Sequence, residues 1–310
     1  MRFLIFMIPA AFAFGYLEYR FYQTPTMYSK KREALERERE SLRGLILGTS
    51  HAVHAYAPEA LPLKAVNLAH VSQSLQIDKE LVARQLDRLP RLCFVVLNLS
   101  GFSFEYRLDG SDDEARNGFY RRYYGFPGDA RPWQLWHPKY LTHFSLFQPD
   151  IARGLIWSGF RKPLGEGITP LGGLDTDQLS RAPNPINAAN GEARAAYHNK
   201  ALRPELAGET TAALRAMLGL LSERKVAVFL ARSPAHAHYH SKLDPEAERR
   251  FALTATTFGV PFADYLRDAR FGDDSFFDVD HLNARGANAF TSLLWREHLA
   301  ALAGPACSPH

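Results

Sequence analysis

The sequence predicts an α/β protein, a three-layer sandwich in which helices cover both faces of a central parallel sheet of about five strands. Short apolar runs typical of buried strands lie at 45–47, 65–67, 93–97, 226–231 and 260–263. Helical patterns alternate with them, at 75–89, 209–224, 243–257 and 284–302. Strands that alternate with helices favour a parallel sheet, and the chemistry of such sheets gathers at the carboxyl ends of the strands.

The composition is that of an ordinary globular protein. The chain has 310 residues, of which 46% are hydrophobic and 23% charged, and a formal net charge of +4. Its basic residues are scattered, so we expect no nucleic-acid partner. Of the two cysteines, Cys93 lies in an apolar strand pattern and Cys307 in a polar tail, so we expect no disulfide between them.

Residues 1–22 are predicted to be a membrane anchor or a signal segment. An apolar run from Phe3 to Leu17 follows one positive charge, which is short for a spanning helix of about 20 residues. An uncleaved anchor is favoured, and Ala11-Phe12-Ala13 offers a cleavage site if the segment is a signal. Either interpretation puts the remaining chain on the extracytoplasmic side, anchored or secreted. The third interpretation is a hydrophobic helix packed on its own domain.

The rest of the chain divides into a spacer, a domain and a tail. Residues 23–43 are rich in charge and in strong helix formers, which predicts a solvated spacer helix. The α/β domain is expected at 44–304, interrupted at about 102–200 by a long irregular insertion, and 305–310 form a tail. The insertion contains FYRRYYGFPGDARPWQLWHPKY. We favour a lid that packs on the sheet, and the alternative is a carbohydrate-contacting surface of aromatic rings and arginines.

The chemistry is expected where the first predicted strand ends, in Gly48-Thr49-Ser50. A glycine there permits a sharp strand-to-helix turn that exposes the Ser50 hydroxyl and lets its own N–H contact an oxyanion. Asp278 and His281 stand three positions apart, directly before the last predicted helix. A serine nucleophile needs such an imidazole and carboxylate. The alternative is that Ser50 only caps the first helix.

The combination resembles the SGNH (GDSL-type) hydrolase superfamily. The resemblance rests on LILGTSHAVHAYAPEAL near the start of the domain, on VNLAHVSQSL, and on FFDVDHLNARGANAF before the last helix. With the N-terminal segment and spacer, the chain is similar to membrane-anchored SGNH-like proteins, including accessory acyltransferases of exported polysaccharides and teichoic acids. The resemblance implies a flavodoxin-like sandwich, Ser50 as nucleophile, His281 as general base and Asp278 as its orienting acid.

The resemblance also points to an oxyanion-binding site. The family's glycine is absent from the second block, so the donor there would be the backbone N–H of Ala69 or His70. Ser100 stands where the family has an asparagine, and Asn98 would need a shifted register to replace it. His51 and Tyr239 are expected to line the pocket, whereas Asp280 is expected to point elsewhere. His236, His238 and His240 share one face if extended, but we expect no metal and no cofactor.

The resemblance implies an esterase or acyltransferase that acts on O-acyl groups, with acetyl favoured, of a cell-envelope or exported polysaccharide. Transfer and hydrolysis use the same triad, so the sequence leaves that choice open. The alternative is a weakly active or inactive scaffold that binds glycan beside a membrane-bound O-acyltransferase. A plain lipase or esterase with an apolar acyl groove is a third option.

Overall fold

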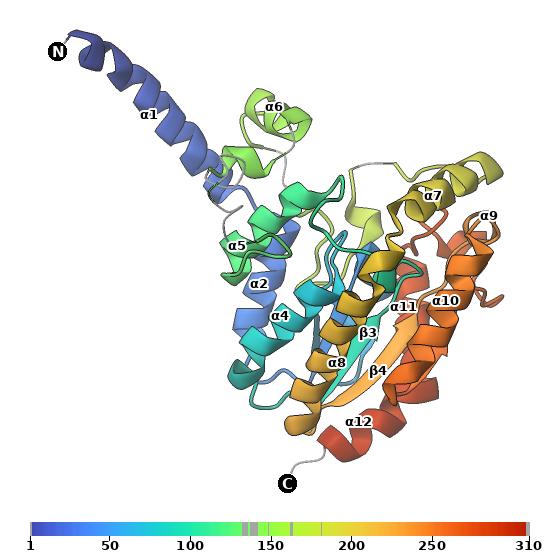
Figure 1. Cartoon of the computed structure of the whole chain (residues 1–310). Coiled ribbons are helices and arrows are strands. Elements are labelled where there is room, and N and C mark those ends of the chain that lie inside the picture. Colours follow the sequence, from blue (N-terminus) through green and yellow to red (C-terminus); the bar gives the residue numbers. More distant parts are fainter. Residues whose placement is uncertain are drawn as a thin grey trace.

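The architecture is a five-stranded, fully parallel sheet in the order β2-β1-β3-β4-β5 (Figure 1). It is seen in a computed structural model that describes residues 2–131, 136, 142–147, 149–161, 164–180 and 182–307. The strands are β1 (Gly44–Gly48), β2 (Ala65–Asn67), β3 (Phe94–Asn98), β4 (Ala227–Arg232) and β5 (Phe262–Asp264). The predicted α/β class and parallel sheet are therefore confirmed.

Helices cover both faces of the sheet. One face packs against α2 (Met27–Glu38), α4 (Leu75–Gln85), α8 (Ala207–Glu223) and α10 (Pro245–Ala255). The other packs against α3 (Ser50–Ala55), α11 (Ala284–Leu294) and α12 (Ala300–Cys307). Alternate residues of β1 enter the two cores, with Leu45 and Leu47 on the first side and Ile46 on the second.

The remaining elements are short. Helix α9 spans Ala237–His240, and a π-helical turn, Trp295–Leu299, joins α11 to α12. Single 3-10 turns lie at Pro58–Ala60, Leu86–Arg88, Ser103–Glu105, Glu114–Arg116, Phe144–Leu146, Thr176–Gln178, Pro204–Leu206, Thr256–Phe258 and Asp273–Ser275.

Helix α2 is not the solvated spacer that its charge suggested. It packs against β2 and α5, and it buries Tyr28, Lys31, Ala34 and Leu35. These positions recur at three- and four-residue spacing, so they form one narrow stripe. The prediction was wrong because Lys31 counts as polar in the pattern, although its side chain is fully buried here.

The two cysteines form a disulfide, contrary to expectation. Cys93 directly precedes β3, and α12 returns across β3 and β4 at the end of the chain. This return brings Cys307 to within 5.2 Å of Cys93 between Cα atoms, although 214 positions separate them in sequence. The prediction failed because the composition of a tail does not say where the tail folds.

The insertion is more helical than expected. It contains α5 (Asn117–Tyr124), α6 (Pro149–Trp157) and α7 (Ala188–Ala201). In α5 the aromatic residues mostly serve packing, because Tyr120 and Tyr124 are buried against Tyr28 and His70. Trp133 and Tyr140 of the same aromatic run lie outside the described residues.

Helix α1 (Arg2–Gln23) projects away from the body of the molecule (Figure 1). Phe12 is 76% exposed, and only the end of the helix packs, where Phe21 contacts Phe147 and Phe160. The option of a helix packed along its own domain is therefore wrong for the residues whose side chains are described. Among these, no helix combines the length and apolar content needed to cross a membrane, and the side chains of residues 1–6 lie outside the description.

Candidate active site

The turn after β1 holds Ser50 at the carboxyl edge of the sheet. Gly48 has a φ of +127°, and a Cβ there would lie 2.5 Å from the carbonyl oxygen of Asn98. Only glycine fits this bend without strain. Thr49 is the N-cap of α3, because its side chain accepts a hydrogen bond from the N–H of His51. The capping role that competed for Ser50 therefore belongs to Thr49, and Ser50 is the first helical residue.

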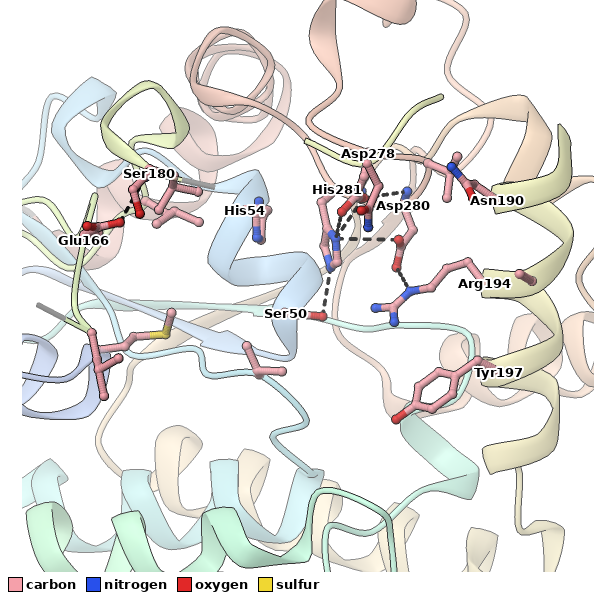
Figure 2. A pocket seen from close by; sticks show the side chains of 18 of the residues that line it. Ser50, His54, Glu166, Ser180, Asn190, Arg194, Tyr197, Asp278, Asp280 and His281 are labelled. Atoms are coloured by element: carbon pink, nitrogen blue, oxygen red, sulfur yellow. Dashed lines mark hydrogen bonds and ion pairs between the residues drawn. The ribbon is translucent and has the colours of Figure 1, made fainter. Parts of the chain in front are cut away.

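Ser50, His281 and Asp278 form a hydrogen-bonded chain (Figure 2). The Ser50 hydroxyl lies 3.1 Å from Nε2 of His281. Nδ1 of the same ring donates to Asp278, at 3.0 and 3.1 Å from its two carboxylate oxygens. Asp278 also accepts the backbone N–H groups of Asp280 and His281. These contacts fix the imidazole with its free nitrogen toward the serine, which is the geometry of a nucleophile and its base.

Asp280 does not point elsewhere as expected. Its carboxylate lies 3.6 Å from Nδ1 of His281, and it also binds Nε2 of His51 at 3.1 Å and Nε of Arg194 at 2.8 Å. Burial alone would raise the pKa of Asp280, but His281, His51 and Arg194 together hold that pKa well below its usual range. Asp280 is therefore a buried anion shared by three cationic or hydrogen-bonding partners.

The imidazole of His281 has a raised pKa. Burial acts to lower the pKa, but Asp280 and then Asp278 stabilise the imidazolium and outweigh burial. A general base must be neutral to accept the serine proton, so activity is expected to fall as pH drops through this raised pKa.

Replacing Asp280 with asparagine is expected to move the acidic limb of kcat/KM to lower pH. The substitution removes the largest contribution that raises the pKa of His281, so the neutral imidazole persists at lower pH. The measurement is a pH–rate profile beside Asp150→Asn, which removes a carboxylate that is 93% exposed. An acidic limb that stays in place or moves upward contradicts the assignment.

His51 lies behind the triad rather than in the cavity wall. Its Nδ1 accepts from the Ser100 hydroxyl at 2.8 Å, and Ser100 in turn lies 2.7 Å from the hydroxyl of Thr49. Burial lowers the pKa of His51 despite Asp280, which favours the neutral ring that this chain of hydrogen bonds requires. His51 and Ser100 thus connect the turn at Thr49 to Asp280 through a chain of hydrogen bonds.

The expected oxyanion donors are engaged elsewhere. The N–H of Ala69 donates to the side chain of Asn67 at 3.0 Å, and the N–H of His70 donates to the carbonyl of Gly48. The side chain of Asn98 accepts from Tyr56 and lies 3.4 Å from the hydroxyl of Ser233. With Ser100 bound to Thr49 and His51, none of these groups faces the cavity beside Ser50.

Lys31 fastens the loop that contains Ala69. Its ammonium donates to the carbonyl of Ala69 at 2.7 Å and to the side chain of Asn67 at 3.3 Å. Burial lowers its pKa well below the usual value, against a smaller opposing effect of Glu59. The sequence offers no signal for this role, because α2 reads as a surface helix.

A cavity of about 780 Å³ opens over the triad, and a second of about 250 Å³ adjoins it at Ser50. Helix α7 supplies one wall, with Asn190, Arg194 and Tyr197 (Figure 2). Glu166 and Ser180 lie on the opposite side, where the N–H of Ser180 donates to Glu166. The insertion therefore builds much of the cavity from polar side chains, which its irregular sequence did not predict residue by residue.

Tyr239 is 2% exposed and lies outside both cavities, and its hydroxyl bonds to His198 at 2.7 Å. Nε2 of His236 pairs with Asp273, and its Nδ1 accepts the backbone N–H of His238 as the N-cap of α9. In the part of the chain that the structure describes, the group that could hold a metal is His51, Asp280 and His281. Their ligand atoms already bond to one another, to Ser50 and Ser100, and to the cation of Arg194, so we interpret them as a hydrogen-bonded network.

Comparison with known proteins adds no identity to this geometry. No protein-family model matches the chain, and no curated protein matches it either. The function must therefore be argued from the site itself, because an α/β sandwich hosts many chemistries.

Proposed function

We propose that this chain is a serine-dependent esterase or O-acyltransferase, and that it acts on acyl groups, acetyl foremost, of an envelope or exported polysaccharide. The observation that carries the proposal is the continuous hydrogen-bonded chain from the Ser50 hydroxyl through His281 to Asp278, with 3.1 Å between Ser50 and the base. The resemblance of the three sequence blocks to SGNH hydrolases supports the same assignment.

In this mechanism His281 takes the proton from Ser50 as the serine oxygen attacks the ester carbonyl carbon. The carbonyl electron pair moves to oxygen and forms a tetrahedral oxyanion. When the pair returns, the bond to the leaving alkoxide breaks, and His281 gives it the proton. A sugar hydroxyl or water then attacks acyl-Ser50 by the same route, which returns the proton to Ser50.

The cavity supports a polar, extended substrate. Its volume of about 780 Å³ exceeds what a small acetyl ester needs, and Asn190, Arg194, Tyr197 and Glu166 line it. Hydrogen-bonding side chains and an exposed ring suit sugar hydroxyls and sugar faces. Leu164, Leu174 and Leu179 add apolar surface to the same cavity, and the polar groups beside them favour a glycan acceptor or donor over a lipid.

The location we propose is extracytoplasmic, with α1 as a membrane anchor or as a signal segment. The disulfide between Cys93 and Cys307 supports an oxidising compartment. The exposed apolar side chains of α1, among them Phe12 and Phe14, support contact with lipid or with a membrane-bound O-acyltransferase.

One observation favours the alternative, a glycan-binding scaffold with little activity. The backbone groups of Ala69 and His70, and the side chains of Ser100 and Asn98, are all engaged away from the cavity. A scaffold needs no oxyanion site, so it tolerates this arrangement. A measurement of acylation at Ser50 distinguishes the enzyme from the scaffold.

Incubation with p-nitrophenyl acetate, followed by acid quenching and peptide mass spectrometry, is expected to find one acetyl group on Ser50. The hydrogen bond to His281 makes this hydroxyl the activated one. Heat-denatured protein serves as the control for acetylation of lysines. A native protein that carries no acetyl group on Ser50, yet still binds the polysaccharide, supports the scaffold instead.

A further inference from the structure

Arg194 enters the cavity from a rigidly placed helix. The side chain of Asn187 caps α7, and Gly191, Ala195 and His198 are buried along a stripe of the helix that adjoins Arg194. Gly191 lets α7 lie against α9, since a Cβ there would meet the carbonyl oxygen of His238 at 2.3 Å. The backbone that carries Arg194 therefore has little freedom to shift.

Contacts with Asp280 and Tyr197 fix the orientation of the Arg194 guanidinium group. Its Nε donates to Asp280 at 2.8 Å, and its carbon lies 5.5 Å from the centre of the Tyr197 ring. Among the described residues, no other side chain or carbonyl forms a hydrogen bond or ion pair with it. Its terminal amino groups point toward the Ser50 hydroxyl (Figure 2), and Arg194 lines both cavities that meet at Ser50.

The cation is permanent at this position. Burial acts to lower the pKa of Arg194, but Asp280 outweighs burial and raises it. Asp280 also compensates part of the charge of this half-buried group, whose side chain is 31% exposed. The terminal amino groups of Arg194 remain to donate to a ligand, and such donors suit an anionic oxygen.

We propose that Arg194 binds the oxyanion of the tetrahedral intermediate, in place of the donors that the Ala69 loop and Ser100 would supply. The inference rests on the proposed function. As Ser50 attacks, the carbonyl π pair moves to oxygen, and this oxygen accepts hydrogen bonds from the terminal amino groups of Arg194. When the pair returns to carbon and the alkoxide leaves with the His281 proton, these bonds weaken. No proton moves to or from Arg194.

The other cation of the cavity is a weaker candidate. Arg116 is engaged by Asp113 at 2.9 Å, and its pKa reflects a further interaction with Tyr28. Its charge is therefore compensated by an immediate partner. Of these two described arginines, Arg194 is the one that pairs with a carboxylate through Nε and has terminal amino groups directed toward the Ser50 hydroxyl.

The rival role for Arg194 is recognition of an anionic substrate group such as a uronate carboxylate or a phosphate. The two roles separate on a neutral substrate. An oxyanion donor acts only in the transition state, so its loss lowers kcat. Loss of a group that binds the substrate in the ground state instead raises KM for anionic substrates and leaves turnover of p-nitrophenyl acetate unchanged.

The test compares Arg194→Ala and Arg194→Lys with wild type on p-nitrophenyl acetate. We expect kcat to fall by about 10²–10³-fold in Arg194→Ala with KM within about threefold, and methylguanidinium in solution to restore part of the rate. Arg194→Lys should retain an intermediate rate, since it keeps the charge without the planar fork. Arg249→Ala removes an arginine that pairs with Glu246 away from the cavity and serves as the matched control.

Three outcomes are decisive. A kcat in Arg194→Ala within about threefold of wild type overturns the proposal. A loss that methylguanidinium does not restore, accompanied by a lower melting temperature than Arg249→Ala, assigns Arg194 a structural role and also overturns it. If wild type itself never carries acetyl on Ser50, the proposed function fails first, whatever the arginine variants do.

Discussion

Replacing Ser50 with alanine is expected to lower kcat for ester turnover by about 10⁴-fold or more, with KM changed little. The hydroxyl is the atom that His281 deprotonates, and no described hydroxyl but that of Ser50 bonds to this imidazole. A water molecule could still be activated by His281, so a slow residual hydrolysis without an acyl-enzyme is the expected remainder. The measurement is steady-state turnover of p-nitrophenyl acetate, combined with mass spectrometry of the quenched protein.

The control for this variant is Ser222→Ala. Ser222 is an exposed serine near the end of α8, a few residues before β4 begins, so it lies at the opposite edge of the sheet. It should keep wild-type turnover and wild-type acetylation. The assignment of Ser50 is abandoned if Ser50→Ala turns over as fast as Ser222→Ala.

The sheet could be predicted because its strands are short, apolar and evenly interleaved with helices. The runs around Ile46, Val66, Val96, Leu230 and Ala263 all became strands. The first three belong to strands that are buried throughout, and a parallel strand buried on both faces requires continuous hydrophobicity. The run around Ala263 became an edge strand that is only partly buried. The Ser50 turn could be predicted for a related reason. A glycine between a buried strand and a helix indicates a bend or a close approach of two backbone segments, and Gly48 has both.

The walls of the site could not be predicted in the same way. Arg194, Tyr197 and Asn190 belong to a helix inside a long insertion, and their local pattern says only that the helix is polar. What makes Arg194 important is Asp280, which lies 86 positions away in sequence. The same holds for the disulfide, where the partner of Cys93 comes from the last described helix.

Hydrogen-bond partners explain why the oxyanion expectation differs from the observed site. Ala69, Ser100 and Asn98 stand in the strand-end loops where the sequence puts them, yet each is engaged by a neighbour that motif reasoning does not include. Asn67 takes the N–H of Ala69, and His51 takes the hydroxyl of Ser100. A motif specifies position along the chain, whereas availability for chemistry depends on every group packed around that position.

Asp278→Asn is expected to lower kcat by about 10³–10⁴-fold, a larger loss than Asp280→Asn should cause. Asp278 accepts Nδ1–H of His281 at 3.0 and 3.1 Å and so keeps Nε2 free to receive the serine proton. An asparagine amide can donate to Nδ1 instead, which puts the ring proton on Nε2 and removes the base.

The backbone of the loop should survive this change, because the asparagine oxygen can still accept the N–H groups of Asp280 and His281. Asp244→Asn is the matched control, since Asp244 is the N-cap of α10 and asparagine caps helices equally well. The measurement is kcat at a pH well above the acidic limb, where the lower pKa of His281 in the variant no longer matters. Turnover in Asp278→Asn within about tenfold of Asp244→Asn would mean that Asp280, at 3.6 Å, orients the base instead.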